Sequence, residues 1–278
     1  MSGFSADWLA LRAPFDDAAR ARSLARRFVA LLPAAPRLVD LGAGTGAARR
    51  AVGPLLGAGA RWTLVDADTT LLQHVSRLGC IVRNININRS LETIFDVDYD
   101  GVTAFALLDL GGDGWLGRLA QAVAARAIPF YAPLIVDGRT EWTPGDPDDA
   151  IVLRAFAGHQ RRRKGLGLAA GPRAPAAAAA AFRRAGYRVA VAPSDWRVPP
   201  GAGAMLAAMI DGAEHAAGEQ APGERARIAA WAARRRRAAS DGRLALTVGH
   251  VDLLAWHPRN GSDRRPVSLR TATVEGVR

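Results

Sequence analysis

Apolar and polar positions along this chain follow two periods that replace each other in turn. Short apolar runs typical of buried strands lie at 37–41, 61–66, 80–85, 102–110, 128–136, 187–192 and 244–256. Helical spacing fills 46–56, 69–78, 115–127 and much of 148–185. Because strands alternate with helices, the pattern predicts an α/β fold with a doubly wound, mostly parallel, seven-stranded sheet.

Two helical segments stand outside this alternation. The first is the N-terminal segment 1–35, with helices expected over 4–32 and a stop at Pro33 and Pro36. The second is 203–240, an insertion of two helices that break around Pro222, just before the last strand. We expect one domain over 1–258, with both segments covering its site, and a basic, disordered tail over 259–278.

The transition from the first strand to its helix carries the strongest signal. The strand 37–41 contains an acid, Asp40, and Gly42, Gly44 and Gly46 follow at alternate positions. Glycine tolerates positive φ and has no side chain to keep a ligand away from the backbone. This strand–loop–helix unit is therefore predicted to bring backbone N–H groups close to a small ligand.

The pattern Asp-x-Gly-x-Gly-x-Gly resembles motif I of class I S-adenosylmethionine-dependent methyltransferases. The chain as a whole resembles bacterial members of this family to which no substrate is assigned. The general resemblance covers roughly residues 36–256 and implies a Rossmann-like fold. It implies that Asp40, Gly42, Gly44 and Gly46 hold the methionine part of the cofactor S-adenosylmethionine.

The same resemblance assigns further cofactor contacts at the ends of the following strands. Asp66 would hydrogen-bond the ribose hydroxyls, with Ala67 beside the adenine, and Ala106 and Leu107 would line the sulfonium side. Asn86 and Ile87 stand where related sequences place an aspartate against the adenine amino group. Asn86 departs from that pattern, but its oxygen can accept from the amino group and its amide can donate to a ring nitrogen.

A dinucleotide site is the nearest alternative, because Gly42, Gly44 and Ala47 satisfy the relaxed fingerprint of such sites. Asp40 argues against it, since a carboxylate beside the loop would repel a pyrophosphate and attract an ammonium or a sulfonium. Asp66 fits both ligands. A third alternative is that the glycines only make a tight turn.

The methyl acceptor leaves weaker signs. Asp109 follows the fourth strand, and it could face the acceptor or cap a helix. His159, in an arginine-rich helical stretch, could act as a base or lie on a solvated helix end. The stretches Asp137–Trp142 and Ser194–Trp196 follow strands and are rich in functional residue types. An Asn/Asp-Pro-Pro-aromatic tetrad is absent after the fourth strand, which argues against methylation of base amino groups.

Composition changes this interpretation little. The net charge of +11 over 278 residues raises the possibility of nucleic-acid binding, but the run Arg234–Arg237 is expected to be a solvated helix face. One cysteine, Cys80, fits a reducing compartment, no apolar run is long enough for a membrane span, and no spacing resembles a metal site.

The sequence thus predicts a cytoplasmic enzyme that transfers a methyl group from S-adenosylmethionine to oxygen or nitrogen of a small molecule. Two alternatives stay open. One is an RNA methyltransferase, in which Arg161–Arg163 and Arg234–Arg237 would form a basic face beside the cofactor. The other is a non-catalytic module that binds S-adenosylmethionine. The acceptor and the oligomeric state are not indicated.

Overall fold

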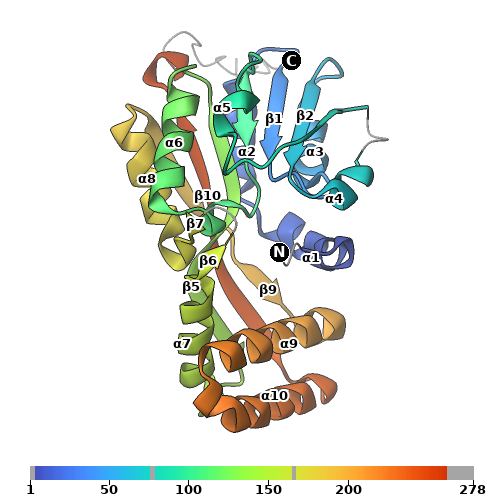
Figure 1. Cartoon of the computed structure of the whole chain (residues 1–278). Coiled ribbons are helices and arrows are strands. Elements are labelled where there is room, and N and C mark those ends of the chain that lie inside the picture. Colours follow the sequence, from blue (N-terminus) through green and yellow to red (C-terminus); the bar gives the residue numbers. More distant parts are fainter. Residues whose placement is uncertain (1–3, 76–78, 165–166, 262–278) are drawn as a thin grey trace, which may run out of the picture.

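The computed structural model describes residues 4–75, 79–164 and 167–261. Its main sheet follows the strand order β3-β2-β1-β4-β5-β10-β8, and β9 pairs with β10 beside β8 (Figure 1). The strands are β1 (Arg37–Leu41), β2 (Arg61–Asp66), β3 (Ile81–Asn84), β4 (Gly101–Thr103), β5 (Phe130–Thr143), β8 (Arg188–Pro193), β9 (Trp196–Val198) and β10 (Ala245–Trp256). The predicted fold class is confirmed, with one strand more than the seven expected within the described residues.

The first five strands of the sheet are parallel, and β10 is antiparallel to its neighbours β5, β8 and β9. Successive residues of a strand point to opposite faces, so each face has its own core. Val39 packs toward one face and Leu38 toward the other. The first face is covered by α5, α6 and α8, and the second by α2, α3 and α4.

The helices of this upper part are short, apart from the first one. They are α1 (Ala6–Ala19), α2 (Arg22–Ala30), α3 (Ala47–Val52), α4 (Thr69–Gln73), α5 (Leu91–Ile94), α6 (Asp113–Ala124) and α8 (Ala174–Arg184). Helix α1 begins at the N-cap Ser5, whose side chain accepts a hydrogen bond from the Trp8 N–H at 3.1 Å. It lies below the parallel strands, at the end of the sheet where their loops gather (Figure 1).

Strands β5 and β10 continue beyond the rest of the sheet and carry a second, helical part of the molecule (Figure 1). Three helices pack there, namely α7 (Asp149–Gln160), α9 (Gly203–Gln220) and α10 (Arg225–Ser240). The break between α9 and α10 falls at Pro222, as predicted. A separate core forms in this lower part, with Trp142, Trp231 and Leu246 buried in it.

Three predicted boundaries were wrong. The strand expected over 128–136 continues to Thr143, so Thr140–Trp142 is paired with β10, and Asp137–Arg139 lies in the irregularity of β5 between two paired stretches. The strand expected over 102–110 ends at Thr103, although the Ala104 and Ala106 N–H groups still donate to carbonyls of β5 at 3.1 and 3.0 Å. The helix expected over 69–78 ends at Gln73.

Two short strands join α7 to α8: β6 (Arg163–Lys164) and β7 (Gly167–Leu168) form a separate antiparallel pair. Turns of 3₁₀ helix complete the chain: η1 (Gly53–Leu55), η3 (Leu108–Leu110), η4 (Gly171–Arg173), η5 (Pro222–Glu224) and η6 (Pro258–Gly261). The predicted disordered tail lies, from residue 262 onward, outside the described residues.

Candidate functional site

The glycine loop joins the carboxyl end of β1 to α3 in a conformation that favours glycine at every second position. Gly42, Gly44 and Gly46 have φ of +67°, +51° and +82°, all in the left-handed region. A Cβ atom added at Gly42 would also lie 2.9 Å from Cδ1 of Leu107. The spacing seen in the sequence is therefore required by backbone conformation at all three positions and by close approach at Gly42.

Asp66, the last residue of β2, fastens this loop to the neighbouring strand. Its Oδ2 accepts a hydrogen bond from the Gly44 N–H at 2.8 Å, and its Oδ1 accepts one from the Asp68 N–H at 3.0 Å. A carboxylate oxygen can accept two hydrogen bonds, so each oxygen keeps capacity for a ligand hydroxyl. The side chain thus shapes the loop and still offers an acceptor beside it.

A cavity of about 270 Å³ lies at the carboxyl ends of the parallel strands, between their loops and helix α1. Most of the predicted cofactor residues line it: Gly42, Gly44, Asp66, Ala67, Asn86, Ile87, Ala106 and Leu107. Helix α1 lines it too, whereas no residue of 203–240 does. The N-terminal segment covers this cavity as predicted, and the 203–240 insertion covers it only indirectly, through contacts between α9 and α1.

Asp40 is buried in β1 and does not line the cavity. Its side chain is 1% exposed, and its Oδ1 accepts a hydrogen bond from the Thr103 hydroxyl at 2.7 Å. Burial raises the pKa of this carboxyl to about 7, and the negative charge of Asp66 adds to the effect. Asp40 can therefore act on a ligand only through its charge, and not through the direct contact that the sequence suggested. Gly46 also lies outside the lining, at the start of α3.

The two residues predicted to be catalytic are not among those that line the cavity. Asp109 lies in the 3₁₀ turn η3, which follows the loop after β4. His159 lies at the end of α7, where its Nε2 is 3.1 Å from Oε2 of Glu219 on α9. Neither residue is among the described residues that line the cavity with the predicted cofactor residues.

Among the charged residues that line the cavity and that the sequence did not single out, two are buried. Arg12 and Asp16 are both buried, one turn apart on α1, and their side chains form an ion pair at 2.9 Å. Asp16 Oδ1 also accepts a hydrogen bond from the indole N–H of Trp196 at 2.9 Å. Burial raises the pKa of Asp16, although Arg12 opposes the shift. The sequence offered one sign of this pair, the i, i+4 spacing of the two residues in a predicted helix. Ion pairs on the helix surface have the same spacing, so it did not indicate burial at a cavity.

Two non-glycine residues with positive φ also line the cavity, namely Ala106 at +48° and Leu134 at +61°. Leu134 lies in an irregularity of β5, where the pairing with β10 shifts register opposite Asp252. The buried Asp252 accepts a hydrogen bond from the Leu134 N–H at 3.0 Å and another from the Tyr131 hydroxyl at 2.8 Å. Backbone strain of this kind gathers at functional sites, where the surroundings hold it in place.

Asn86, which replaces the expected aspartate, makes a local turn. Its Oδ1 accepts a hydrogen bond from the Asn88 N–H at 3.1 Å. The amide oxygen keeps a second lone pair, and the side chain also has its two N–H donors for a ligand. Both roles that the sequence left open for Asn86 are therefore available in this arrangement.

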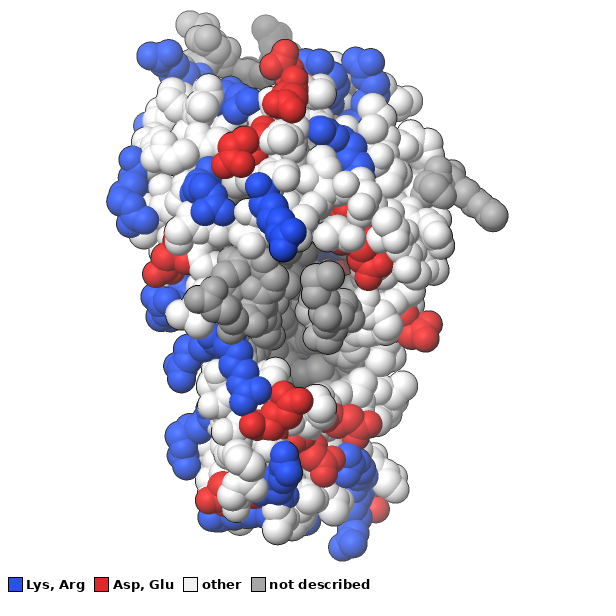
Figure 2. All heavy atoms as spheres, in the orientation of Figure 1, with Lys and Arg blue, Asp and Glu red and all other residues white. Residues whose placement is uncertain are grey.

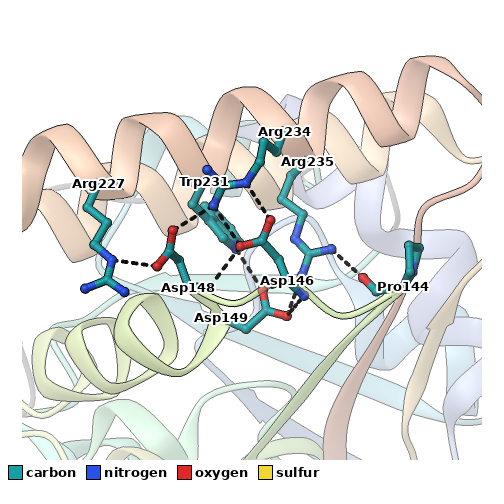
Figure 3. Close-up of polar contacts among 8 residues, drawn as sticks. All are labelled: Pro144, Asp146, Asp148, Asp149, Arg227, Trp231, Arg234 and Arg235. Atoms are coloured by element: carbon teal, nitrogen blue, oxygen red, sulfur yellow. Dashed lines mark hydrogen bonds and ion pairs between the residues drawn. The ribbon is translucent and has the colours of Figure 1, made fainter.

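The arginine run on α10 is engaged in ion pairs within the lower part. Arg234 binds Asp146 and Asp148, each at 2.7 Å, while the buried Arg235 binds Asp149 (Figure 3). Arg236 pairs with Asp211 and Glu214. The run is thus only partly the solvated face that the sequence suggested, since Arg235 is 2% exposed.

Acidic and basic side chains are interspersed over the face of the molecule in Figure 2, most closely in its lower part. Arg162, in the other arginine-rich stretch, donates to Gln220 at 2.8 Å and to Glu219 at 3.2 Å. None of the residues that line the cavity belongs to either stretch. Within the described residues, neither arginine-rich stretch therefore contributes a side chain to the cavity lining, whereas the RNA methyltransferase alternative placed them beside the cofactor.

Two further searches of the described part of the chain gave no candidate. No group of three or more His, Cys, Asp or Glu side chains there could hold a metal ion. No helix there is long and apolar enough to cross a bilayer.

Comparison with known proteins found similar folds but no sequence family. No protein-family model matches the sequence, and no curated protein does. A cyclopropane-fatty-acyl-phospholipid synthase-like protein from Lactobacillus casei is 16% identical, with a TM-score of 0.48 over 86% of this chain and 98% of that one. An S-adenosylmethionine-dependent methyltransferase from Thiobacillus denitrificans, in complex with S-adenosyl-L-homocysteine, is 17% identical, with a TM-score of 0.40 over 85% and 91%. A cyclopropane synthase from Mycobacterium tuberculosis is 12% identical, with a TM-score of 0.45 over 92% and 87%.

Proposed function

We propose that this chain binds S-adenosylmethionine and transfers its methyl group to oxygen or nitrogen of a small molecule. One observation carries the proposal: two left-handed glycines, Gly42 and Gly44, and Asp66 line one cavity at the carboxyl ends of adjacent parallel strands. In the order β3-β2-β1-β4-β5 this is also where the chain reverses direction across the sheet, between β1 and β4. Open α/β sheets bind nucleosides and nucleotides at such a point.

The residues around the cavity fit the parts of that cofactor in sequence across the sheet. Asn86 and Ile87, after β3, would hold the adenine, and Asp66, after β2, would accept from the ribose hydroxyls. The glycine loop after β1 would hold the methionine part through its backbone. When bound, S-adenosylmethionine supplies an electrophilic methyl group. The protein would supply orientation and a dry environment, through the apolar side chains of Phe105, Leu107 and Leu134 and the cover of α1.

Asp40 distinguishes a cationic ligand from a dinucleotide. With a pKa of about 7, its carboxyl is only partly ionised at neutral pH. A nearby ammonium or sulfonium favours the ionised form, so its binding should release protons. A pyrophosphate favours the neutral form, so its binding should take protons up. The number of protons released or taken up on binding is therefore expected to tell a cationic ligand from a pyrophosphate ligand.

The experiment is a calorimetric titration at pH 7 with S-adenosylmethionine, S-adenosylhomocysteine and, as a control, NADH. Each titration is run in two buffers of different ionisation enthalpy, which gives the number of protons released. We expect micromolar binding of both sulfur nucleosides with proton release, and loss of that release in Asp40→Asn. Binding of NADH alone, or no binding of any of the three, would overturn the proposal.

Catalysis requires its own measurement, because the same binding is expected of a non-catalytic module. Methyl transfer from S-adenosylmethionine labelled in its methyl group to a fraction of small molecules from bacterial extract would support an enzyme. Transfer only to an RNA fraction would replace the small-molecule acceptor by RNA. Tight binding without transfer to either fraction would favour the binding module.

A further inference from the structure

The cavity has a second half that the proposed cofactor does not use. Most of the predicted cofactor residues follow the carboxyl ends of β3, β2 and β1, and only Ala106 and Leu107 follow β4. Among the lining residues not assigned to the cofactor, Phe105, Leu110 and Leu134 belong to the β4 and β5 side, and a further group belongs to α1. This half therefore adjoins the end of the glycine loop and is available to another molecule.

Helix α1 covers this half with a single stripe of side chains. Residues 9, 12, 13, 16, 17 and 20 all line the cavity, and their spacing of three and four is that of one helix face. The charges on the stripe cancel in pairs, because Arg12 binds Asp16 at 2.9 Å and Arg20 binds Asp17 at 2.8 Å. The helix thus presents hydrogen-bonding groups to the cavity but no net charge.

Asp16 is the buried acceptor on this stripe with capacity for a further hydrogen bond. Its Oδ1 already accepts from Arg12 Nη2 at 3.0 Å and from the Trp196 indole at 2.9 Å. Its Oδ2 accepts at short range only from Arg12 Nε, at 2.9 Å. A carboxylate oxygen has room for a second donor, so Oδ2 can take a hydrogen bond from a molecule in the cavity.

The carboxylate is also held in a fixed direction by a residue from another part of the fold. Trp196 belongs to β9, which pairs with β10 next to β5. The guanidinium of Arg12 lies 4.7 Å from the centre of the Trp196 ring, and the ring of Trp8 packs against it edge-on. Asp16 is therefore oriented from two sides, as a binding group must be to select a ligand by its geometry.

We infer that Asp16 binds the methyl acceptor, and that the acceptor is a small neutral molecule with an apolar body and a hydroxyl or amine group. The inference rests on the function proposed above. The hydroxyl or amine donates to Oδ2 of Asp16, and the apolar body lies against Phe105, Leu110 and Leu134. A carboxylate acceptor is disfavoured, because Arg12 is already paired and the added negative charge would face Asp16.

The test uses phenol, aniline and benzoate as probes of similar size that differ in their polar group. Their binding to the protein saturated with S-adenosylhomocysteine is measured by ligand-observed NMR titration, with no turnover involved. We expect phenol and aniline to bind the wild type and benzoate to bind at least 10-fold more weakly. Asp16→Asn should weaken phenol binding about 10-fold, the loss expected for a hydrogen bond to a charged group.

Three further variants separate binding by Asp16 from a merely structural role. Asp7→Asn alters an exposed acid on the same helix, outside the cavity lining, and should change nothing. Asp16→Glu keeps the charge and should retain part of the phenol affinity. Trp196→Phe removes the bond that ties Asp16 to β9 but leaves the carboxylate, so phenol binding should persist. A role limited to anchoring α1 predicts equal losses in Asp16→Asn and Trp196→Phe.

Several outcomes would overturn the inference. They are unchanged phenol binding in Asp16→Asn, equal losses in Asp16→Asn and Trp196→Phe, stronger binding of benzoate than of phenol, and no binding of any probe to the wild type. The affinity for S-adenosylhomocysteine is measured first and should be the same in all variants. The probe titrations are repeated without S-adenosylhomocysteine. The failures of the two proposals can then be told apart, because the proposed function fails only if the wild type does not bind that nucleoside.

Discussion

Two regions of this molecule gather aspartates and arginines, and their carboxyl groups behave in opposite ways. In the lower part, the guanidinium of Arg234 lowers the pKa of Asp146, and Arg227 and Arg234 lower that of Asp148. At the cavity, burial raises the pKa of Asp16 and of Asp40. The same side chain is thus stabilised as an anion in one region and destabilised in the other.

The difference lies in how completely each charge is compensated. The loop between β5 and α7 is held to α10 by arginines that approach its carboxylates from one helix, and Arg235 also donates to the carbonyl of Pro144 (Figure 3). Asp40 receives one hydroxyl, that of Thr103. Groups left short of compensation gather at functional sites, where a ligand completes the set. The lower cluster accordingly joins elements of the fold, whereas the upper carboxyl groups belong to the candidate site.

The largest effect is expected at Asp40, and it tests the difference between the two regions. The folded chain holds this proton more tightly than the unfolded chain, so stability should fall as pH rises from about 4 to about 7. Asp40→Asn keeps an acceptor for Thr103 and removes the charge. At pH 8 it should raise the free energy of unfolding by roughly 4 kcal/mol, from a shift of about three units.

Urea denaturation of the wild type and of Asp40→Asn gives their free energies of unfolding at pH 4.5 and pH 8. The effect is the difference between the two proteins at pH 8 minus their difference at pH 4.5. Groups elsewhere that titrate in the same window cancel between the two proteins. A gap between them that does not change with pH would contradict the prediction, because it would mean that Asp40 stays ionised throughout.

The next effect concerns the lower cluster. Arg235→Ala removes the cation from Asp149 and leaves that carboxylate, in a partly buried place, with two neutral donors: the indole N–H of Trp231 and the Asp146 N–H, each at 2.8 Å. Breaking a buried ion pair by removing one partner is expected to cost about 3 kcal/mol of unfolding free energy. The affinity for S-adenosylhomocysteine should stay unchanged, because none of these residues lines the cavity. Urea denaturation measures the free energy of unfolding, and calorimetric titration measures the affinity. A loss of both would mean that the lower cluster also supports the cavity, which would contradict the prediction.

A smaller and opposite pattern is expected at Asp66. Asp66→Ala removes the acceptor for ribose hydroxyls and also the anchor of the Gly44 N–H, so binding of S-adenosylhomocysteine should weaken by about 1–3 kcal/mol. Asp66→Asn should not restore it, because the Gly44 and Asp68 N–H groups each need an oxygen and the amide offers one. Calorimetric titration gives the affinities, with exposed Asp98→Asn as a control. Unchanged affinity in Asp66→Ala would undo the assignment of the ribose site.

What the sequence could predict was local. The glycine loop is encoded by consecutive residues, and Asp66 is placed by the end of its own strand. The structure places Gly42, Gly44 and Asp66 at the cavity, together with Asn86 and Ala106, and their role in binding a cofactor stays a prediction.

What the sequence could not predict depends on distant pairings. Asp16 becomes a cavity residue through α1 and through Trp196, 180 positions later in the chain. The Asp137-Gly138 pair is typical of a turn, yet it lies inside β5, in an irregularity between two stretches that pair with β10, with Gly138 at φ +89°. Arg235 is buried because Asp149, 86 positions away, lies opposite it. Such contacts between distant residues cannot be predicted from the periodicity or the charge of the sequence.

The smallest expected effect sharpens the comparison within a single run of arginines. Arg236 follows Arg235, but its side chain is 45% exposed and pairs with Asp211 at 2.6 Å and with Glu214 on the solvated side of α9. Exposed pairs contribute little, because water screens them and two long side chains must be ordered. Arg236→Ala should therefore change the free energy of unfolding by less than about 1 kcal/mol, and still less in high salt. Urea denaturation at low and high salt measures this beside Arg235→Ala. Equal losses in the two variants would mean that the number of pairs, and not their burial, holds α10 to the rest of the lower part.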